Sequence, residues 1–170
     1  MPKNKLSGFT LISKACKGFT LIELLVVISI IGVLASLAII SFTGTQKQAR
    51  DTQRKSDIHQ YQNSLEVFAN RNNGLYASRV SSSGESASSV LCADLELTGC
   101  PEDPRNADDP TFVYQYQSDG SGAGELDATQ YVLWARLENK SNFWVVCSNG
   151  QTGETPQSGW TNPSGGTCPI

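Results

Sequence analysis

Glu23 is the residue whose surroundings in the sequence most clearly call for a chemical partner. It is the only charged residue between Phe19 and Ile40, a run of 22 residues made mostly of Leu, Ile, Val and Ala. A carboxylate costs on the order of 3 kcal/mol at the centre of a membrane-spanning helix and less near its end. One interpretation places Glu23 near the interface, where it reaches water. The other gives the carboxylate a cationic partner.

Cleavage of the chain could create that cation. Glu23 follows the segment Lys17-Gly18-Phe19-Thr20-Leu21-Ile22. A cut after Gly18 removes a leader with four lysines and no acidic residue, and it leaves a new α-amine on Phe19, one helical turn from Glu23. A neighbouring helix shifted along its axis by about a turn could bring its own amine to this carboxylate. Both charges are then neutralised in lipid only when helices stack in register.

The run from Phe19 to Ile40 is long enough to cross a membrane, because a helix rises about 1.5 Å per residue and the hydrocarbon core is ~30 Å thick. The lysine-rich leader predicts a cytoplasmic N-terminus, with the acidic remainder outside. One alternative is a secretory signal cut after Ala38, since Ser36-Leu37-Ala38 resembles a cleavage site; another is a buried helix of a soluble protein. The run continues to Phe42 and is longer than a usual signal, which favours a retained span.

A polar helix with one apolar stripe is predicted beyond the span. Residues 45–73 contain no Gly or Pro, and apolar residues recur there at spacings of three and four: Ile58, Tyr61, Leu65, Phe68 and Ala69. Lys47, Asp51 and Lys55 are expected to form solvated i,i+4 ion pairs. Asn73-Gly74 predicts the end of the helix, because Gly tolerates the left-handed conformation of a helix cap.

The expected fold class is α+β, with one long N-terminal helix packed against a small antiparallel sheet. Strands are predicted at Thr111–Gln117, Thr129–Leu137 and Asn142–Cys147, the last two forming a hairpin. Loops are predicted at residues 78–89, 119–124 and 151–166, which are rich in Ser, Gly or Pro. The expected divisions are a removed leader (1–18), a transmembrane assembly helix (19–42), a rod helix (43–74) and a globular head (75–170).

Four cysteines of the head are predicted to form two disulfides, because they make an even set beyond a membrane span: Cys92, Cys100, Cys147 and Cys168. Three pairings are possible. Cys92–Cys100 with Cys147–Cys168 is favoured, since each bridge closes a loop otherwise short of regular structure. Cys16 lies in the leader. A zinc site is the alternative, but the sequence has no CxxC pair and its lone His59 lies in the rod helix.

No arrangement typical of an enzyme is present. The sequence lacks the nucleotide-binding pattern GxxxxGKS/T, the nucleophile elbow GxSxG and the zinc motif HExxH. Asp119, Glu125 and Asp127 could bind calcium, but their spacing does not fit an EF-hand loop, and a solvated acidic loop is favoured. Nine basic against sixteen acidic residues after residue 18 argue against nucleic acid as a direct high-affinity partner. We expect no catalysis, no cofactor and no resident metal.

Residues 17–27 resemble the class III signal of type IV pilins and type II secretion pseudopilins. The shared features are the pair Gly18–Phe19, glutamate as the fifth residue after the cut, and the apolar run that follows. The resemblance implies that a prepilin peptidase cleaves Gly18–Phe19 on the cytoplasmic side and N-methylates Phe19. It also implies that Glu23 guides assembly of a helical filament. Residues 8–12 repeat Gly-Phe-Thr-Leu-Ile, but Ser13 stands where the glutamate is needed.

The resemblance is weaker beyond residue 45. The segment Arg50–Tyr76 is similar to the rod of pilins and of the major pseudopilin, and Cys100–Pro104 is similar to the Asp-Pro segment that leads into the sheet of the latter. Two features depart from the family pattern. Ile40 stands where many pilins have a proline, and the leader of 18 residues is longer than is typical of phenylalanine-first pilins.

The function implied by the resemblance is that of a structural subunit. It would polymerise with other pilin-like subunits, through an inner-membrane assembly platform with a cytoplasmic ATPase, after storage in membrane lipid. The first interpretation is a subunit of an extracellular type IV pilus or pilus-like filament, which the C-terminal region bounded by Cys147 and Cys168 favours. The alternative is the major-type pseudopilin of a periplasmic secretion pseudopilus, which the Asp-Pro segment favours. A single-span anchored binding module is the alternative from another class, and an anchored enzyme is a third. Trp134, Trp144 and Trp160 could line a binding site, but Trp134 and Trp144 lie on predicted strands and are favoured as core residues.

Overall fold

The computed structural model describes residues 18–80, 83–122 and 124–170, with the backbone alone at residues 37–41. The chain separates into two compact units, the N-terminal unit (residues 1–41) and the head unit (residues 42–170). One helix, α1 (Leu21–Arg71), begins in the first unit and ends in the second. The leader lysines, Cys16 and the repeat at residues 8–12 lie outside the described residues.

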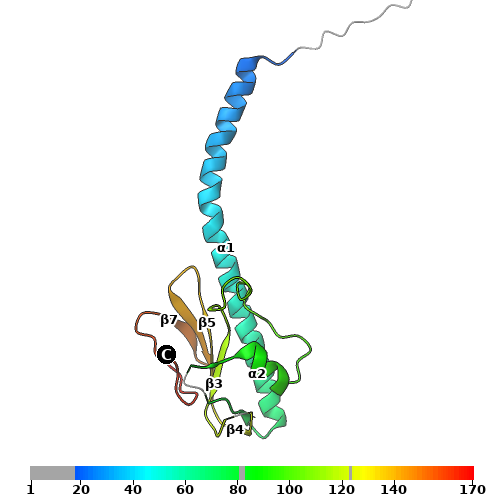
Figure 1. The fold of residues 1–170 in the computed structure, drawn as a ribbon, viewed down its shortest axis with the longest axis vertical. Helices are drawn as coiled ribbons and strands as arrows, with labels where there is room; N and C mark the ends of the chain where they lie inside the picture. The colour runs from blue at the N-terminus through cyan, green and yellow to red at the C-terminus, as the bar shows by residue number, and fades with distance from the viewer. Residues whose placement is uncertain (1–17, 81–82, 123) are drawn as a thin grey trace, which may run out of the picture. The chain divides into compact units, whose positions relative to one another are not determined.

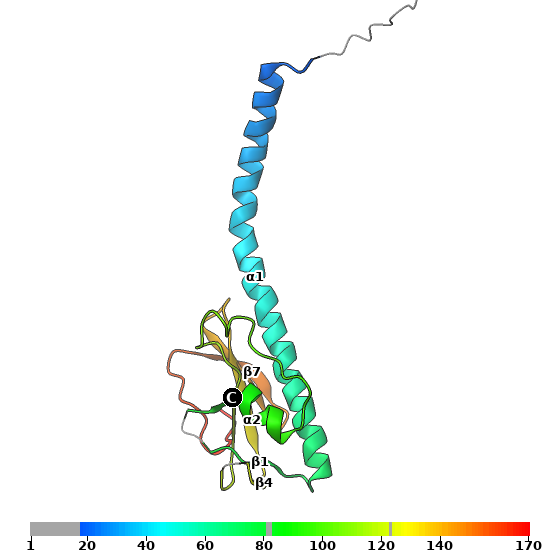
Figure 2. The ribbon, with the colours of Figure 1, turned by 45° about the vertical axis from the view of Figure 1, so that its right-hand side comes forward.

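The head unit combines the C-terminal part of α1 with a short helix and two antiparallel sheets (Figures 1 and 2). β1 (Tyr76–Ala77) pairs with β4 (Leu126–Ala128). The larger sheet has the order β2-β3-β5-β6-β7. Its strands and the second helix are β2 (Glu85–Ser86), α2 (Ala87–Asp94), β3 (Gln115–Ser118), β5 (Tyr131–Arg136), β6 (Asn142–Cys147) and β7 (Thr152–Pro156). The α+β class expected from the sequence is confirmed.

The apolar stripe of α1 forms one wall of the main core. Ile58, Tyr61 and Leu65 are fully buried, whereas Phe68, also part of the expected stripe, is only half-buried. The stripe packs with residues of the sheet that alternate along β5, namely Tyr131, Leu133 and Ala135. The helix ends where the sequence predicts. Asn73 and Gly74 have φ of 57° and 81°, and the Gly74 amide donates to the Ala69 carbonyl at 2.8 Å.

The opposite face of the sheet carries a second, smaller core. Val132 and Trp134 of β5 are buried there with Val145 and Cys147 of β6. Trp160, from the segment after β7, packs against this cluster, with its ring centroid 6.0 Å from that of Trp134. Because β5 is covered on both faces, its sequence is almost uniformly apolar, as is typical of a central strand.

Several predicted boundaries in the head were wrong. The segment 151–166 contains β7, which pairs with β6 from Val146↔Thr152 to Asn142↔Pro156. The serine-rich segment 78–89 contains β2 and the start of α2, and β3 begins four residues later than the predicted strand at Thr111. β7 was missed because it is an edge strand of sequence TGETP. Its residues are mostly polar and do not alternate with apolar ones, so the sequence carries no strand pattern.

The expected solvated ion pairs of the rod were also wrong. Asp51 bonds to Arg54 at 2.7 Å and accepts the backbone amides of residues 138 and 139, each at 2.8 Å. Lys55 pairs instead with Glu154 of β7 at 2.8 Å. Helical spacing alone favoured partners within α1, but side chains brought close by the fold compete for the same charges.

No helix within the described part of the chain is long and apolar enough to cross a membrane. The span expected at Phe19–Ile40 therefore remains a prediction from the sequence.

Candidate processing and assembly site

The expected cleavage bond lies in exposed, non-helical backbone just before α1. Gly18 and Phe19 precede the first helical residue by three and two positions, and the Phe19 side chain is 85% exposed. A Cβ built on Gly18 meets no atom within 4 Å. Among residues 18–80, 83–122 and 124–170, none covers the Gly18–Phe19 bond, and a peptidase substrate must be open in this way. Cleavage and methylation there remain predictions.

Thr20 and Glu23 form a capping box at the start of α1. The carboxylate oxygen Oε2 of Glu23 accepts the Thr20 backbone amide at 2.9 Å and the Thr20 hydroxyl at 2.7 Å. The Glu23 amide in turn donates to the Thr20 hydroxyl at 3.3 Å. This reciprocal arrangement satisfies amides that a helix N-terminus otherwise leaves unpaired. Sequence reasoning missed it, although Thr-x-x-Glu ahead of an apolar run is its signature.

The apolar side chains around Glu23 have no partner within the described part of their own unit. Every described residue from 18 to 36 is exposed, including large side chains on all sides of the helix. Leu24 is 61% exposed, Val33 is 63% and Ile22 is 69%. Phe19, Ile22, Val26 and Val27 surround Glu23 in one shallow hollow. A helix that is apolar all round requires lipid or other helices to cover it.

The four cysteines expected to bridge do so in the structure, in the local pattern that the sequence favours. Cys92 joins Cys100 and Cys147 joins Cys168, with Cα–Cα distances of 5.8 and 5.7 Å. The first bridge ties the end of α2 to the loop before β3. The second ties β6 to the C-terminal segment that covers the outer face of the sheet. Both therefore hold loop segments on the head rather than forming a reactive site.

The acidic loop considered for calcium is held together by its own hydrogen bonds. Asp119 accepts the Thr129 amide at 2.7 Å, the Thr129 hydroxyl at 2.6 Å and the Gln130 amide at 3.0 Å. Asp127 accepts the Ser121 amide at 3.0 Å. In the ranges that the structure describes, no group of three or more His, Cys, Asp or Glu residues is placed to hold a metal ion.

A buried charged network, missed by the sequence analysis, fixes the start of the head unit. The Arg54 guanidinium is fully buried and bonds to Asp103 at 2.6 and 2.8 Å, to Asp51 at 2.7 Å and to Glu138 at 2.6 Å. Arg50 forms a bidentate pair with Glu138 at 2.7 and 2.6 Å. The hydrogen bond from Arg50, joined by those from Arg54, lowers the pKa of Glu138 to about 2. The Asp-Pro segment thus supplies Asp103 as a partner for α1.

The two tryptophans on strands serve packing rather than an exposed binding site. Trp134 is 2% exposed, and Trp144 lies under the Lys55 ammonium, 4.4 Å from its ring centroid. Trp160 packs against Phe143 with the ring centroids 4.6 Å apart and the ring planes tilted by 40°. His59 contacts the edge of Trp144 and bonds to Gln62 at 3.0 Å. These rings stabilise the sheet and leave the binding-module hypothesis without its proposed site.

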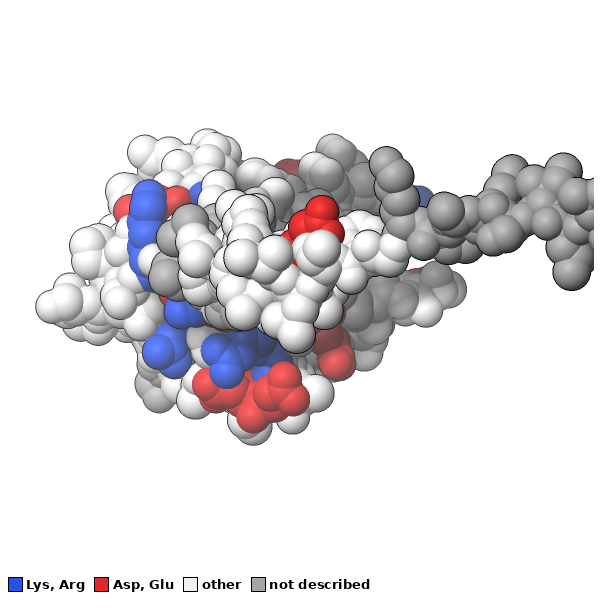
Figure 3. Space-filling model, turned by 90° about the horizontal axis from the view of Figure 1, so that it is seen from above, with Lys and Arg blue, Asp and Glu red and all other residues white. Residues whose placement is uncertain are grey.

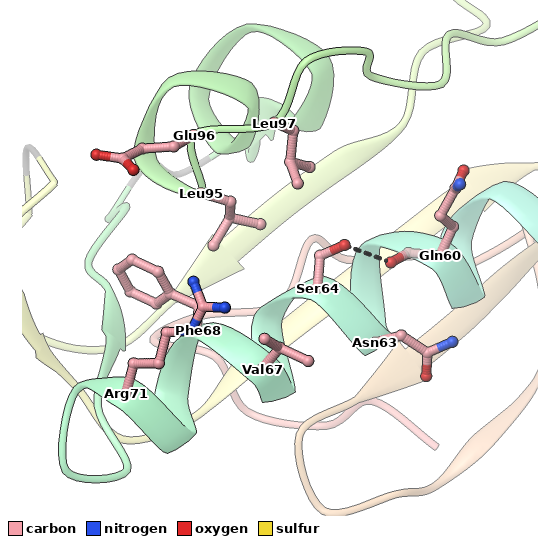
Figure 4. Close-up of a pocket in the computed structure, with 9 residues that line it drawn as sticks. All are labelled: Gln60, Asn63, Ser64, Val67, Phe68, Arg71, Leu95, Glu96 and Leu97. Carbon is pink, nitrogen blue, oxygen red and sulfur yellow. Dashed lines mark hydrogen bonds between the residues drawn. The ribbon is translucent and has the colours of Figure 1, made fainter.

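A shallow groove lies between the outer side of α1 and the turn after α2 (Figure 4). Val67 and Phe68 face Leu95 and Leu97 across it, with Arg71 and Glu96 at one end. The remaining lining residues are Gln60, Asn63 and Ser64. The Ser64 hydroxyl donates a hydrogen bond to the Gln60 backbone carbonyl at 2.9 Å. Its lining contains no base placed beside a nucleophile, so the groove offers contact surface rather than catalysis.

Comparison with known proteins identifies the motif and the family. A family model described as the prokaryotic N-terminal methylation motif matches residues 13–39. The chain is 44% identical over 52 residues to type II secretion system core protein G of Escherichia coli K12, covering 31% of this chain and 36% of the relative. For the protein of the same name from Aeromonas hydrophila, identity is 41% over 56 residues, covering 33% and 39%.

A longer match extends into the head. The chain is 32% identical over 118 residues to type II secretion system core protein G of Pectobacterium carotovorum subsp. carotovorum, covering 65% of this chain and 72% of the relative. The matches to the Escherichia and Aeromonas proteins span less than two fifths of those proteins, and the Pectobacterium match almost three quarters. With the methylation motif at its start and this similarity along rod and head, the chain belongs to the pilin-like family of type II secretion pseudopilins.

Proposed function

We propose that this protein is a structural subunit of a pilus-like filament, stored in the membrane and polymerised through the N-terminal part of α1. The observation that carries the proposal is the exposed apolar part of α1, residues 21–36, which begins two residues after the motif at Gly18–Phe19. Such a surface is covered by lipid before assembly and by neighbouring helices afterwards. Because lipid is as apolar as the helices, packing and charge pairing must select the assembled register.

Glu23 supplies the charge pairing in this proposal. A prepilin peptidase cuts after Gly18, and the new Phe19 amine is methylated and stays cationic. Oε2 of Glu23 is already used by Thr20, whereas Oε1 has no partner among the described residues. Oε1 is therefore free to accept the amine of a neighbouring subunit, while Oε2 keeps the helix start ordered. The capping box does not involve the leader, so it survives the cut.

The proposed arrangement in the membrane follows the sequence. Residues 19–42 form the assembly helix, which spans the cytoplasmic membrane once with its N-terminus in the cytoplasm. Residues 43–74 form the rod and residues 75–170 the globular head, outside. An assembly platform with a cytoplasmic ATPase supplies the force for extraction, and the chain itself performs no bond chemistry. The four leader lysines support this orientation.

Between the two filament types, we favour the secretion pseudopilus over the surface pilus. The relatives that match are named type II secretion system core protein G, and one of the matches extends over 118 residues into the head. The network around Arg54 also gives the Asp-Pro segment a structural role through Asp103. The Cys147–Cys168 bridge, which suggested a pilus, packs against the outer face of the sheet.

The test is filament assembly by two Glu23 variants. Glu23→Ala removes both the charge and the cap, whereas Glu23→Gln removes the charge but retains an acceptor suited to a capping box. We expect both variants to reach the membrane and neither to be recovered in assembled filaments, whether sheared from the cell surface or cross-linked within the periplasm. Glu102→Ala, which removes an exposed carboxylate of the head, is the matched control and should assemble.

The pair separates the two roles of Glu23. Normal filaments from Glu23→Gln, with none from Glu23→Ala, would show that the cap matters and that the amine–carboxylate pairing is wrong. Normal filaments from both variants would remove Glu23 from assembly altogether.

A further inference from the structure

A polar pocket lies at the start of the head unit, beside the first turns of α1 that belong to it. Its volume is about 130 Å³, room for a small polar group. Three of its lining residues carry positive charge, namely Lys47, Arg105 and Arg136. The rest are Phe112, Leu137, Glu138, Ser141 and Gln157. The proposed filament function gives this pocket no role.

Basic residues are concentrated at this end of an otherwise acidic chain. Seven of the nine basic residues after residue 18 either line this pocket or contact Glu138, Glu154 or Phe112. They are Lys47, Arg50, Arg54, Lys55, Arg105, Arg136 and Lys140. Figure 3 views the molecule from above and shows basic side chains gathered beside acidic ones. A local excess of cations in a chain of net negative charge indicates a surface suited to an anion.

The carboxylate in the pocket is already neutralised. Glu138 is 3% exposed, and Arg50 and Arg54 both bond to it. Arg105 adds a third guanidinium, 3.6 Å from its Oε2 atom. Glu138 therefore positions the arginines and presents little uncompensated negative charge to an incoming group.

Two cations of the pocket, Lys47 and Arg136, form no ion pair within 4.0 Å in the described ranges, whereas Arg105 lies 4.0 Å from Asp109. Lys47 is exposed and forms no ion pair there. Arg136 donates at 3.0 Å to the Thr111 hydroxyl, which itself donates to Asp109 at 2.7 Å. Arg136 also stacks on Phe112, with 4.9 Å from its guanidinium carbon to the ring centroid. Arg105 stacks on the same ring at 4.8 Å, so both guanidinium groups are held by Phe112. Positioned guanidinium groups with an adjacent ammonium suit a phosphate group.

The position of Lys47 along α1 places the pocket at the depth of the lipid headgroups. The apolar run of the sequence ends at Phe42, and five helical residues place Lys47 about 8 Å further along the axis. A headgroup layer is about 5–8 Å thick on each side of the hydrocarbon core. We propose that Lys47, Arg105 and Arg136 bind the phosphate of an anionic phospholipid in the leaflet from which α1 emerges. This rests on the proposed membrane storage of the subunit.

The test measures lipid binding to the full-length protein in detergent by native mass spectrometry. The probes are phosphatidylglycerol, phosphatidylcholine and inorganic phosphate. We expect preferential retention of phosphatidylglycerol, because the choline group neutralises the phosphate of the second lipid. Each basic residue near an anionic surface is worth about a fivefold change in affinity, so Lys47→Gln should weaken binding about fivefold and Lys47→Gln with Arg136→Gln about 25-fold.

Lys140→Gln is the matched control, because Lys140 lies at the same end but pairs with Glu154 outside the pocket. Because Lys47 is exposed, Lys47→Gln should leave the fold intact. This single variant therefore tests the site even where the double variant does not fold. Equal retention by the wild-type and Lys47→Gln proteins would overturn the proposal. Full displacement of the lipid by millimolar inorganic phosphate would assign the pocket to a soluble anion and overturn the lipid assignment.

The lipid measurement is independent of filament assembly. A wild-type chain that binds phosphatidylglycerol at this pocket but forms no filament contradicts the proposed function alone. A chain that forms filaments but shows no preference for phosphatidylglycerol contradicts the lipid site alone.

Discussion

In the N-terminal unit Leu24 is 61% exposed, whereas in the head unit Leu65 and Leu133 are fully buried. The head unit covers its apolar residues itself, with α1 on one face of the sheet and the Trp160 segment on the other. The N-terminal unit covers none of those that the structure describes. Its only polar organisation there is local, in the Thr20–Glu23 cap and in serine hydroxyls bonded to their own helix.

This contrast shows where each unit obtains its stability. The head unit has cores, ion pairs and disulfides, so changes within it should alter unfolding and leave processing at Gly18 unaffected. The N-terminal unit depends on lipid or on other chains, so changes within it should alter assembly and leave unfolding of the head unaffected. A head-unit variant that alters processing at Gly18, or an N-terminal variant that alters unfolding of the head unit, would contradict this assignment.

The largest expected effect on unfolding comes from Arg54→Ala. It leaves Asp51, Asp103 and Glu138 without their shared buried cation, and loss of one partner from a buried charged group costs about 3–5 kcal/mol. Urea unfolding of the full-length protein in detergent, followed by tryptophan fluorescence, measures the loss. Arg71→Ala, at an exposed position of the same helix, should cost less than about 0.5 kcal/mol. Equal losses for the two variants would contradict the assigned role of the network.

The disulfides come next and can be compared with each other. Replacing both Cys147 and Cys168 by Ser should lower the free energy of unfolding by about 3 kcal/mol, and replacing Cys92 and Cys100 by about 2 kcal/mol. The difference arises because the Cys147–Cys168 bridge closes the longer loop. The sequence separations are 21 and 8 residues. The same unfolding assay under non-reducing conditions measures both. A larger loss from the shorter loop would contradict this ranking.

Acid should weaken the head through Glu138. Its pKa is lowered from 4.5 to about 2 in the folded protein, chiefly by the hydrogen bond from Arg50. The unfolded chain therefore takes up this proton first as the pH falls. The resulting stability is complete above about pH 4.5 and is lost towards pH 2, a change of roughly 2 kcal/mol after screening by solvent.

Urea unfolding between pH 6 and pH 2 measures this loss, with Glu138→Gln as the reference. The variant should be less stable at pH 6 and should show a flatter decline below about pH 4.5. Parallel profiles for the two proteins would mean that Glu138 does not carry the pH dependence.

The smallest expected effect distinguishes two neighbouring glycines. Gly165 and Gly166 both have positive φ, so alanine should cost about 1 kcal/mol at either position. At Gly165 a Cβ meets no atom within 4 Å, whereas at Gly166 it lies 2.5 Å from the Gln130 carbonyl oxygen. Gly166→Ala should therefore cost at least about 1 kcal/mol more than Gly165→Ala. Equal unfolding midpoints would show that the C-terminal segment is not held against residue 130.

The sequence predicted the elements whose patterns are local. The spacing of Ile58, Tyr61 and Leu65 identified the buried side of α1, Asn73-Gly74 identified its end, and the apolar runs identified β5 and β6. β7 has no such pattern, because an edge strand is defined by hydrogen bonds to β6 rather than by burial.

Within the candidate site, the missed features depended on partners distant in sequence or on an overlooked signal. Arg54 continues the buried stripe of α1, but a charge becomes acceptable there only because Asp103 and Glu138 lie 49 and 84 residues away. No pattern within the helix could show this. The Thr20–Glu23 cap was readable, since its spacing lies within four residues.

The intact mass of the protein from a membrane fraction, with fragmentation of its N-terminus, tests the central claim most directly. The proposed function predicts a chain that begins at Phe19 and carries one added methyl group. Such a chain has the amine that Glu23 is expected to pair with in a neighbouring subunit. A chain that begins at Met1 or at Ile39 would lack that amine beside Glu23, and would contradict assembly through the N-terminal unit.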